Sequence, residues 1–133
     1  MTFCAAPKLA ARLRRNFPAS LHNAPALLPT DNTALRRCLE RWFQQRQIRP
    51  RVVAEFDDAA LMKVMAADEE GFAPIPTVVA AEAVTRYRLE KIGATQECKE
   101  QFYAITAERR IVHPAAVTIT QNAQARLFAA SAK

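Results

Sequence analysis

The stretch ALLPTDNTALRRCLERWFQQRQIRPRVVAEF, residues 26–56, decides the fold class, because a strand, a helix and a second strand follow one another in it. Ala26–Leu28 reads as a short buried strand between two prolines, and the polar run after it is rich in helix N-cap residues. Thr33–Gln47 then reads as an amphipathic helix, since its apolar residues recur at helical spacing: Leu35, Cys38, Leu39, Trp42 and Phe43. After Pro50 the β-branched run Arg51–Phe56 predicts the second strand.

The same alternation continues downstream. Helix Ala59–Ala67, strand Phe72–Ile75 and helix Val78–Tyr87 follow in order. Strand–helix alternation of this kind predicts an α/β fold with a mostly parallel sheet flanked by helices. The remaining elements are weaker: strands at Thr2–Ala5, Leu89–Ile92 and Gln101–Ala107, a marginal helical turn within Pro7–Pro18, and a last helix from Pro114 to Phe128.

A ligand site is predicted where the parallel strands end. Right-handed crossovers place the three helix N-termini at one edge of the sheet, and open α/β sheets bind ligands at this edge. The backbone N–H groups of helix starts favour an anion or a polar small molecule. The candidate ligand-facing residues are Thr30, Asn32, Asp57, Asp58, Ile75, Pro76 and Thr77.

The carboxylates Glu55, Asp57 and Asp58 form the densest polar group at this edge, and two interpretations of them stay open. They contact a cation or a polar ligand, or they serve as a helix cap with solvated neighbours. Thr77 is a further candidate cap, for the helix that follows it.

Catalytic and metal-binding motifs are absent from the sequence. It contains no glycine-rich phosphate loop, no HExxH and no GxSxG, and His22 and His113 have no nucleophile signature beside them. Cys4, Cys38 and Cys98 are odd in number and far apart, so neither a disulfide framework nor a zinc site is indicated. A redox-active cysteine pair stays open as an alternative to simple packing of Cys38. The sequence therefore predicts a binding protein rather than an enzyme, with no cofactor and no metal.

Targeting signals are also missing. No run approaches the roughly 18 apolar residues of a membrane span, and the start of the chain does not resemble a signal peptide. We therefore expect a cytoplasmic protein without a membrane partner.

The charge is unevenly distributed. The chain carries a net charge of +6, and residues 1–51 alone hold ten Lys and Arg against Asp31 and Glu40. A stand-alone basic nucleic-acid-binding protein is one alternative function, and a small solute-binding or dimerisation module is another. The predicted helices are separated by strands, however, and this excludes a helix-turn-helix among them.

Several motifs together resemble the carboxyl-terminal part of LysR-type transcriptional regulators, and most closely an NhaR-like subgroup that activates sodium–proton antiporter genes. The similarity extends from about Thr2 to Phe128, and EFDDAALMK and YAI-x-AER-x-x-x-HPA are the specific motifs. It is carried by ALLPTDNTALRR, Trp42–Phe43, RPRVVAEFDDAALMK, GFAPIPT and EQFYAITAERRIVHP.

The resemblance implies an architecture. Such a regulator has an N-terminal winged helix-turn-helix and two subdomains of the type 2 periplasmic-binding-protein fold, with the effector bound between them. Residues 1–133 then form a partial effector-binding domain, mainly its second subdomain. Residues 101–133 form the return strand and helix toward a missing first subdomain.

The resemblance also implies a function. The expected function is the ligand-sensing portion of a regulator, truncated and without its DNA-binding domain. The implied partners are a small molecule or an ion, with sodium allowed by the resemblance, and a second copy of the chain. DNA would be contacted only through the missing N-terminal domain.

Overall fold

The computed structural model describes residues 1–100 and 114–123, and the chain divides into two compact units, Met1–Glu100 and Gln101–Lys133. The strands of the first unit are β1 (Thr2–Ala5), β2 (Pro25–Pro29), β3 (Arg51–Phe56), β4 (Ala73–Ile75) and β5 (Glu90–Ala94). Its helices are α1 (Pro7–Arg14), the 3-10 turn η1 (Ala19–Leu21), α2 (Ala34–Gln45), α3 (Ala59–Ala67) and α4 (Thr77–Tyr87). The second unit contributes helix α5 (Pro114–Ala123), which confirms the predicted helix start at Pro114.

Strands β2, β3 and β4 run parallel to one another, as predicted. β2 pairs with β3 in a parallel ladder, and a parallel bridge joins Ala26 of β2 to Phe72, the residue before β4. The backbone nitrogen of Leu27 donates to the Phe72 oxygen at 2.9 Å, and that of Phe72 donates to the Pro25 oxygen at 2.9 Å. β1 then pairs with both β4 and β5 in antiparallel register, so the strand array is mixed rather than mostly parallel. The sequence pattern had not assigned a direction to β1.

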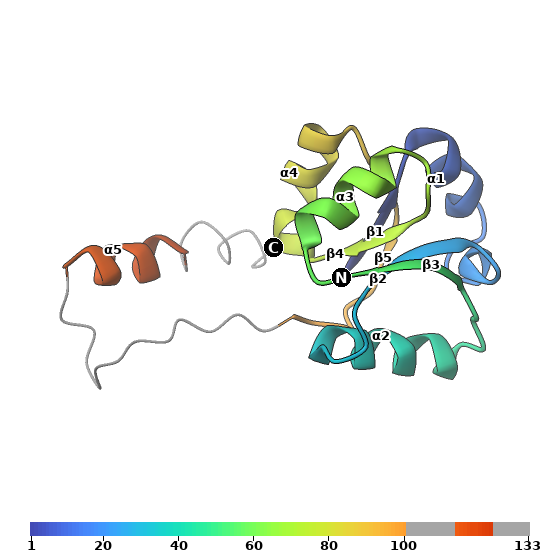
Figure 1. Ribbon diagram of the computed structural model, residues 1–133, viewed down its shortest axis with the longest axis horizontal. Helices are drawn as coiled ribbons and strands as arrows, with labels where there is room; N and C mark the ends of the chain where they lie inside the picture. The colour runs from blue at the N-terminus through green and yellow to red at the C-terminus, as the bar shows by residue number, and fades with distance from the viewer. Residues whose placement is uncertain (101–113, 124–133) are drawn as a thin grey trace. The chain divides into compact units, whose positions relative to one another are not determined.

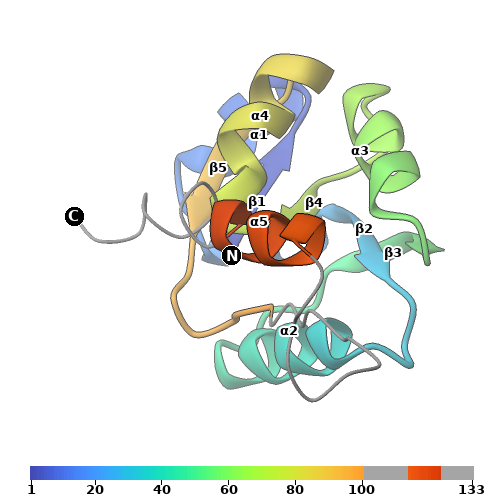
Figure 2. The same cartoon turned by 90° about the vertical axis from the view of Figure 1, so that its left-hand side faces the viewer.

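Helices cover both faces of this strand array, and each face has its own apolar core. Phe3 and Leu28 point to the core formed with α1 and α2, where Trp42 and Phe43 are buried. Cys4 and Leu27, which alternate with them along the strands, point to the core formed with α3 and α4. Figures 1 and 2 show α2 on one side of the β2–β3 pair and α3 on the other.

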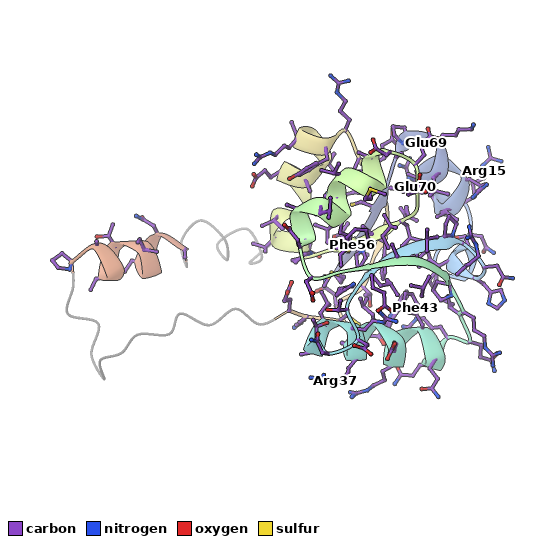
Figure 3. The ribbon with its side chains drawn as sticks, in the orientation of Figure 1. Arg15, Arg37, Phe43, Phe56, Glu69 and Glu70 are labelled. Carbon is purple, nitrogen blue, oxygen red and sulfur yellow. The ribbon has the colours of Figure 1, made fainter. Side chains whose placement is uncertain are left out.

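The amphipathic pattern of helix α2 determines which of its faces packs against the sheet. Its buried residues include Leu39, Trp42 and Phe43, and Figure 3 shows Phe43 directed toward the sheet and Arg37 directed away from it. The Thr33 side chain accepts a hydrogen bond from the Arg36 backbone nitrogen at 3.0 Å, so the N-cap predicted in this polar run is confirmed.

Two local expectations differ from the structure. Residues 7–14 form a full helix rather than a marginal turn, because Leu9, Ala10 and Leu13 bury one face of it in the core. Thr77 was predicted to cap α4 but is its first residue, and the N-cap position belongs to Pro76, which has no side-chain cap. The predicted strand Gln101–Ala107 lies outside the described residues.

Gly71, which lies between α3 and β4, packs closely against the backbone of β2. A Cβ atom at this residue would lie 2.8 Å from the Pro25 carbonyl oxygen, which is backbone and cannot move aside easily. The missing side chain therefore allows the close approach that places β4 beside β2.

Among the described residues, no helix is long and apolar enough to cross a membrane.

Candidate functional site

The predicted ligand-facing edge exists in the structure as a line of strand ends. β2 ends at Pro29, β3 at Phe56 and β4 at Ile75, and the three strands run in the same direction. Thr30, Asp57 and Pro76 therefore follow them at one edge, where helices α2, α3 and α4 begin soon afterwards.

Thr30, Asn32 and Asp57 are in direct contact, and we call them the Thr30 cluster. The Thr30 Oγ1 atom lies 2.6 Å from Asp57 Oδ1 and 3.1 Å from Asn32 Oδ1. The Thr30 backbone nitrogen donates to the Phe56 oxygen at 3.2 Å, which fixes the two strand ends beside each other. A hydroxyl has one hydrogen to donate, so two acceptors compete for it and oxygen lone pairs stay available to a ligand.

Asp58 has a structural role instead. Its Oδ1 atom accepts from the Ala60 backbone nitrogen at 2.6 Å and lies 3.4 Å from that of Leu61. It is therefore the N-cap of α3, and the helix-cap interpretation is confirmed for this carboxylate. Glu55 is also occupied, since it accepts from Arg36 Nη1 at 2.7 Å.

The carboxylate group thus separates into a cap, an ion-pair partner and one cluster member. Only Asp57 of the three belongs to the Thr30 cluster. In the part of the chain that the structure describes, no group of three or more His, Cys, Asp or Glu residues could hold a metal ion.

The β4 end of the edge carries a second pair of hydroxyls. Thr77 Oγ1 lies 3.0 Å from Thr2 Oγ1, a contact between α4 and β1. Ile75 is fully buried in the core, so only its backbone is available at the edge, and Pro76 is half-buried.

Thr2 belongs to this edge but was not predicted there. β1 is antiparallel to β4 and places Thr2 opposite Ile75, so the start of β1 lies where β4 ends. No sequence signal indicated this placement, because the direction of a short apolar strand cannot be read from its own residues.

A separate groove lies between α2 and β3, and it does not include the Thr30 cluster. Its volume is about 850 Å³, and its walls carry both charged and apolar side chains. It is lined by His22, Asn23, Leu28, Arg36, Glu40, Phe43, Gln44, Gln47, Ile48, Arg49, Pro50 and Val52.

Arg36 forms the buried end of this groove. Its Nη1 atom donates to the Pro29 carbonyl at 2.8 Å and to Glu55 at 2.7 Å, while its Nε atom donates to Glu40 at 2.9 Å. Burial by itself would lower the pKa of Arg36, but the two carboxylates raise it above its usual value. The guanidinium therefore stays charged and ties α2 to the ends of β2 and β3.

Comparison with known proteins gives consistent results. The family model described as the LysR substrate binding domain matches residues 1–127. Transcriptional activator protein NhaR of Escherichia coli (strain K12) is 35% identical over 112 residues, which are 84% of this chain and 37% of that protein. NhaR of Shigella flexneri matches with the same values. The chain thus spans about a third of the length of these relatives.

A solved structure supports the fold. The structure titled "Effector binding domain of QuiR in complex with shikimate" matches with a TM-score of 0.50 and 12% identity, over 90% of this chain and 57% of that chain. This likeness concerns the arrangement of strands and helices, and it agrees with the predicted resemblance to a periplasmic-binding-protein subdomain. The match over residues 1–127 and the identity to NhaR together place the chain in the LysR substrate-binding domain family.

Proposed function

We propose that this chain is the effector-sensing portion of a LysR-type, NhaR-like transcriptional regulator. The observation that carries the proposal is the Thr30 cluster, which collects hydroxyl, amide and carboxylate oxygens at the edge where the parallel strands end. The role is binding rather than catalysis, in a cytoplasmic protein, as the kinship to a transcriptional activator suggests.

The effector that fits this edge is a polar small molecule or an ion. Hydroxyl and amide groups can both donate and accept, and the Asp57 carboxylate selects donors or cations. QuiR was solved with shikimate, a ligand of that protein. The resemblance to NhaR keeps sodium as the ionic alternative, and the first subdomain of such a regulator would form the opposite wall.

The first test is substitution of the Thr30 cluster. In a full-length relative, Thr30→Val and Asp57→Asn at the matching positions keep the side-chain shape and remove the hydroxyl or the charge. We expect each to raise the effector concentration for half-maximal reporter expression at least about tenfold, because hydrogen bonds to charged groups contribute about 1.5–3 kcal/mol.

A matched control is Asp31→Asn, which removes a charge from an exposed neighbour outside the cluster. It should leave the dose–response curve in place. Asp58→Ala is less informative, because it also removes the N-cap of α3. Thr77→Ala tests the β4 end of the edge in the same way. Unchanged curves for Thr30→Val, Asp57→Asn and Thr77→Ala together would remove the ligand assignment.

The alternative of a nucleic-acid-binding protein makes a different prediction. Sequence readout requires a helix or strand presented to a DNA groove. In the described residues, α2, α3 and α4 are separated by strands, so no helix-turn-helix is formed there. We expect this chain to show no sequence-selective retardation of promoter DNA in a gel-shift titration at physiological salt.

The control for that titration is a scrambled duplex of equal length. Weak retardation of both duplexes that disappears as salt rises would reflect the net charge of +6 and no more. Selective, salt-resistant retardation of the promoter fragment would support the nucleic-acid alternative instead.

We also propose self-association through the face formed by α2 and β3. β3 has a hydrogen-bonded neighbour on one side only within the described sheets, and Val52 and Val53 on it are 42% and 40% exposed. An exposed edge strand with apolar side chains favours pairing with another chain.

Val52→Lys is expected to shift dimers to monomers, because it places a charge on this edge and in the groove beside α2. Val64→Lys is the matched control, since Val64 on α3 is 43% exposed but lies outside that face. Sedimentation velocity measures both. A wild-type chain that is monomeric at every concentration, or equal dissociation by both variants, would contradict this interface.

A further inference from the structure

Two cysteines that are 60 residues apart in the sequence lie side by side in the fold. Cys38 is in helix α2, and Cys98 follows the end of β5. Their Sγ atoms are 3.0 Å apart, about 1 Å farther than the roughly 2.05 Å of a disulfide bond. A small side-chain movement would therefore bring them to bonding distance.

The two thiols differ in their access to solvent. Cys98 is fully buried, whereas Cys38 is half-buried and its Sγ atom lies 3.6 Å from the Glu97 carbonyl oxygen. Burial, followed by the hydrogen bond to Cys38, raises the pKa of the Cys98 thiol to about 12. A small oxidant from solvent thus reaches Cys38 first, whereas Cys98 is the more deeply buried of the two and stays a protonated thiol.

Cys4 provides an internal comparison. It is fully buried in β1 and belongs to the core formed with α3 and α4, on the other face of the strands. Burial raises the pKa of its thiol to about 11. Cys4 therefore combines the burial of Cys98 with a position away from Cys38.

We propose that Cys38 and Cys98 form a reversible thiol–disulfide couple that fastens α2 to the segment after β5 when the protein meets a peroxide. The sensing of an effector at the Thr30 cluster does not depend on it. In a reducing compartment such a pair stays reduced until an oxidant arrives, as redox-sensing cysteines do.

The chemistry balances with hydrogen peroxide as the oxidant. The Cys38 thiolate attacks one peroxide oxygen, the O–O bond breaks, and the other oxygen leaves as water after taking up a proton. The Cys98 sulfur then attacks the sulfenic acid of Cys38, so the S–S bond forms and the S–O bond breaks. The Cys98 proton leaves with the hydroxide as a second water, and the two thiols have lost two electrons in total.

The bond would act on a segment that leads from one unit to the next. Glu97 already pairs with Arg46, the C-cap residue of α2, so the end of the helix and this segment are also in contact beside the cysteine pair. The first unit ends at Glu100, two residues after Cys98. A disulfide would convert this contact into a covalent link between α2 and the last residues of the first unit, whereas the reduced thiols leave the two segments joined by noncovalent contacts alone.

Peptide mapping tests the couple on the unaltered chain. The protein is treated with hydrogen peroxide, quenched, unfolded with an alkylating agent present and digested with trypsin. We expect alkylatable thiols to fall from the three of the sequence to one, with Cys38–Arg41 and Ile92–Lys99 joined in a single peptide. Dithiothreitol before alkylation should restore all three thiols.

Cys4→Ala is the matched variant and should still give the joined peptide, whereas Cys38→Ser and Cys98→Ser should not. Hydrogen exchange then compares the oxidised and reduced wild type, and slower exchange in α2 and residues 95–100 is expected in the oxidised form. Three alkylatable thiols after peroxide, a link that includes Cys4, a link between two chains, sulfinic acid on Cys38 beside a free Cys98, or unchanged exchange would each overturn the proposal.

Discussion

Gly93→Ala is expected to lower the free energy of unfolding of the Met1–Glu100 unit by about 3 kcal/mol, at the upper end of the usual cost of overpacking. A Cβ atom at this position would lie 2.4 Å from Cδ1 of Phe17, with two further ring atoms within 2.6 Å. Alanine is the better strand residue by roughly 0.5–1 kcal/mol, since glycine loses more backbone entropy on folding. The steric clash exceeds that gain, so the substitution destabilises the protein.

The Phe17 ring has little room to withdraw. Its centroid lies 5.7 Å from that of Phe3 and 6.2 Å from that of Trp42, so a displaced ring would press on the aromatic core. Gly93 itself is paired with Phe3 across the β1–β5 ladder, and this pairing restricts movement of the strand. Neither Phe17 nor the strand at Gly93 can therefore move easily to relieve the clash.

Urea unfolding followed by circular dichroism measures the effect, and a double-mutant cycle identifies its cause. In a Phe17→Ala background the clashing ring is absent, and we expect Gly93→Ala to cost less than about 1 kcal/mol there. An equal cost in both backgrounds would mean that the glycine matters for its backbone rather than for the space beside it.

The local features of the fold could be predicted from the sequence. The helix of residues 33–47 was visible in the spacing of its apolar residues, and its Thr33 cap was visible in the polar run before it. The strand–helix order also predicted the parallel direction of β2, β3 and β4, which brought Thr30 and Asp57 to one edge. Each of these inferences depends on near neighbours in the chain or on a general rule of connection.

Features that depend on distant contacts could not be predicted. The antiparallel direction of β1 places Thr2 beside Thr77, yet nothing within Thr2–Ala5 specifies that direction. For Cys38 the sequence left both packing and a redox-active pair open, and its contact with Cys98 appears only when β5 is placed beside β1. The roles of the two glycines likewise come from Pro25 and Phe17, which are remote in sequence.

Asp58 shows how local and distant roles compete for one residue. It was a candidate ligand because the strand ends converge, and a candidate cap because a helix follows it. In the structure, the Asp58 side chain accepts a hydrogen bond from the backbone at the start of α3. Asp57, one residue earlier, instead accepts a hydrogen bond from the Thr30 hydroxyl at the end of the neighbouring strand. The sequence alone could not distinguish two adjacent aspartates, because the choice depends on which side of the strand each faces.

Trp42→Ala is expected to cost about 3–5 kcal/mol of unfolding free energy, the range for removing a large aromatic side chain from a core. Trp42 is 3% exposed and stacks on Phe3 with a centroid separation of 5.1 Å, and its ring lies 5.4 Å from that of Phe43. Its removal would therefore open a cavity at the centre of the aromatic core that joins α2 to β1. The free energy of unfolding of a domain is commonly only about 5–15 kcal/mol, so this loss would markedly raise the unfolded fraction.

Trp42→Phe is the matched variant and should cost clearly less, for two reasons. The phenyl ring keeps most of the stacking area, and the substitution removes the indole Nε1–H, which is buried without a hydrogen-bond partner in the described structure. An unsatisfied buried donor costs about 1–3 kcal/mol, so its loss offsets part of the missing ring volume. Thermal unfolding by circular dichroism compares the variants, because Trp42 is the single tryptophan and its fluorescence is lost with it. Equal destabilisation by Ala and Phe would show that the indole N–H has a partner in solution and that its hydrogen bond, rather than ring packing, holds α2 on the sheet.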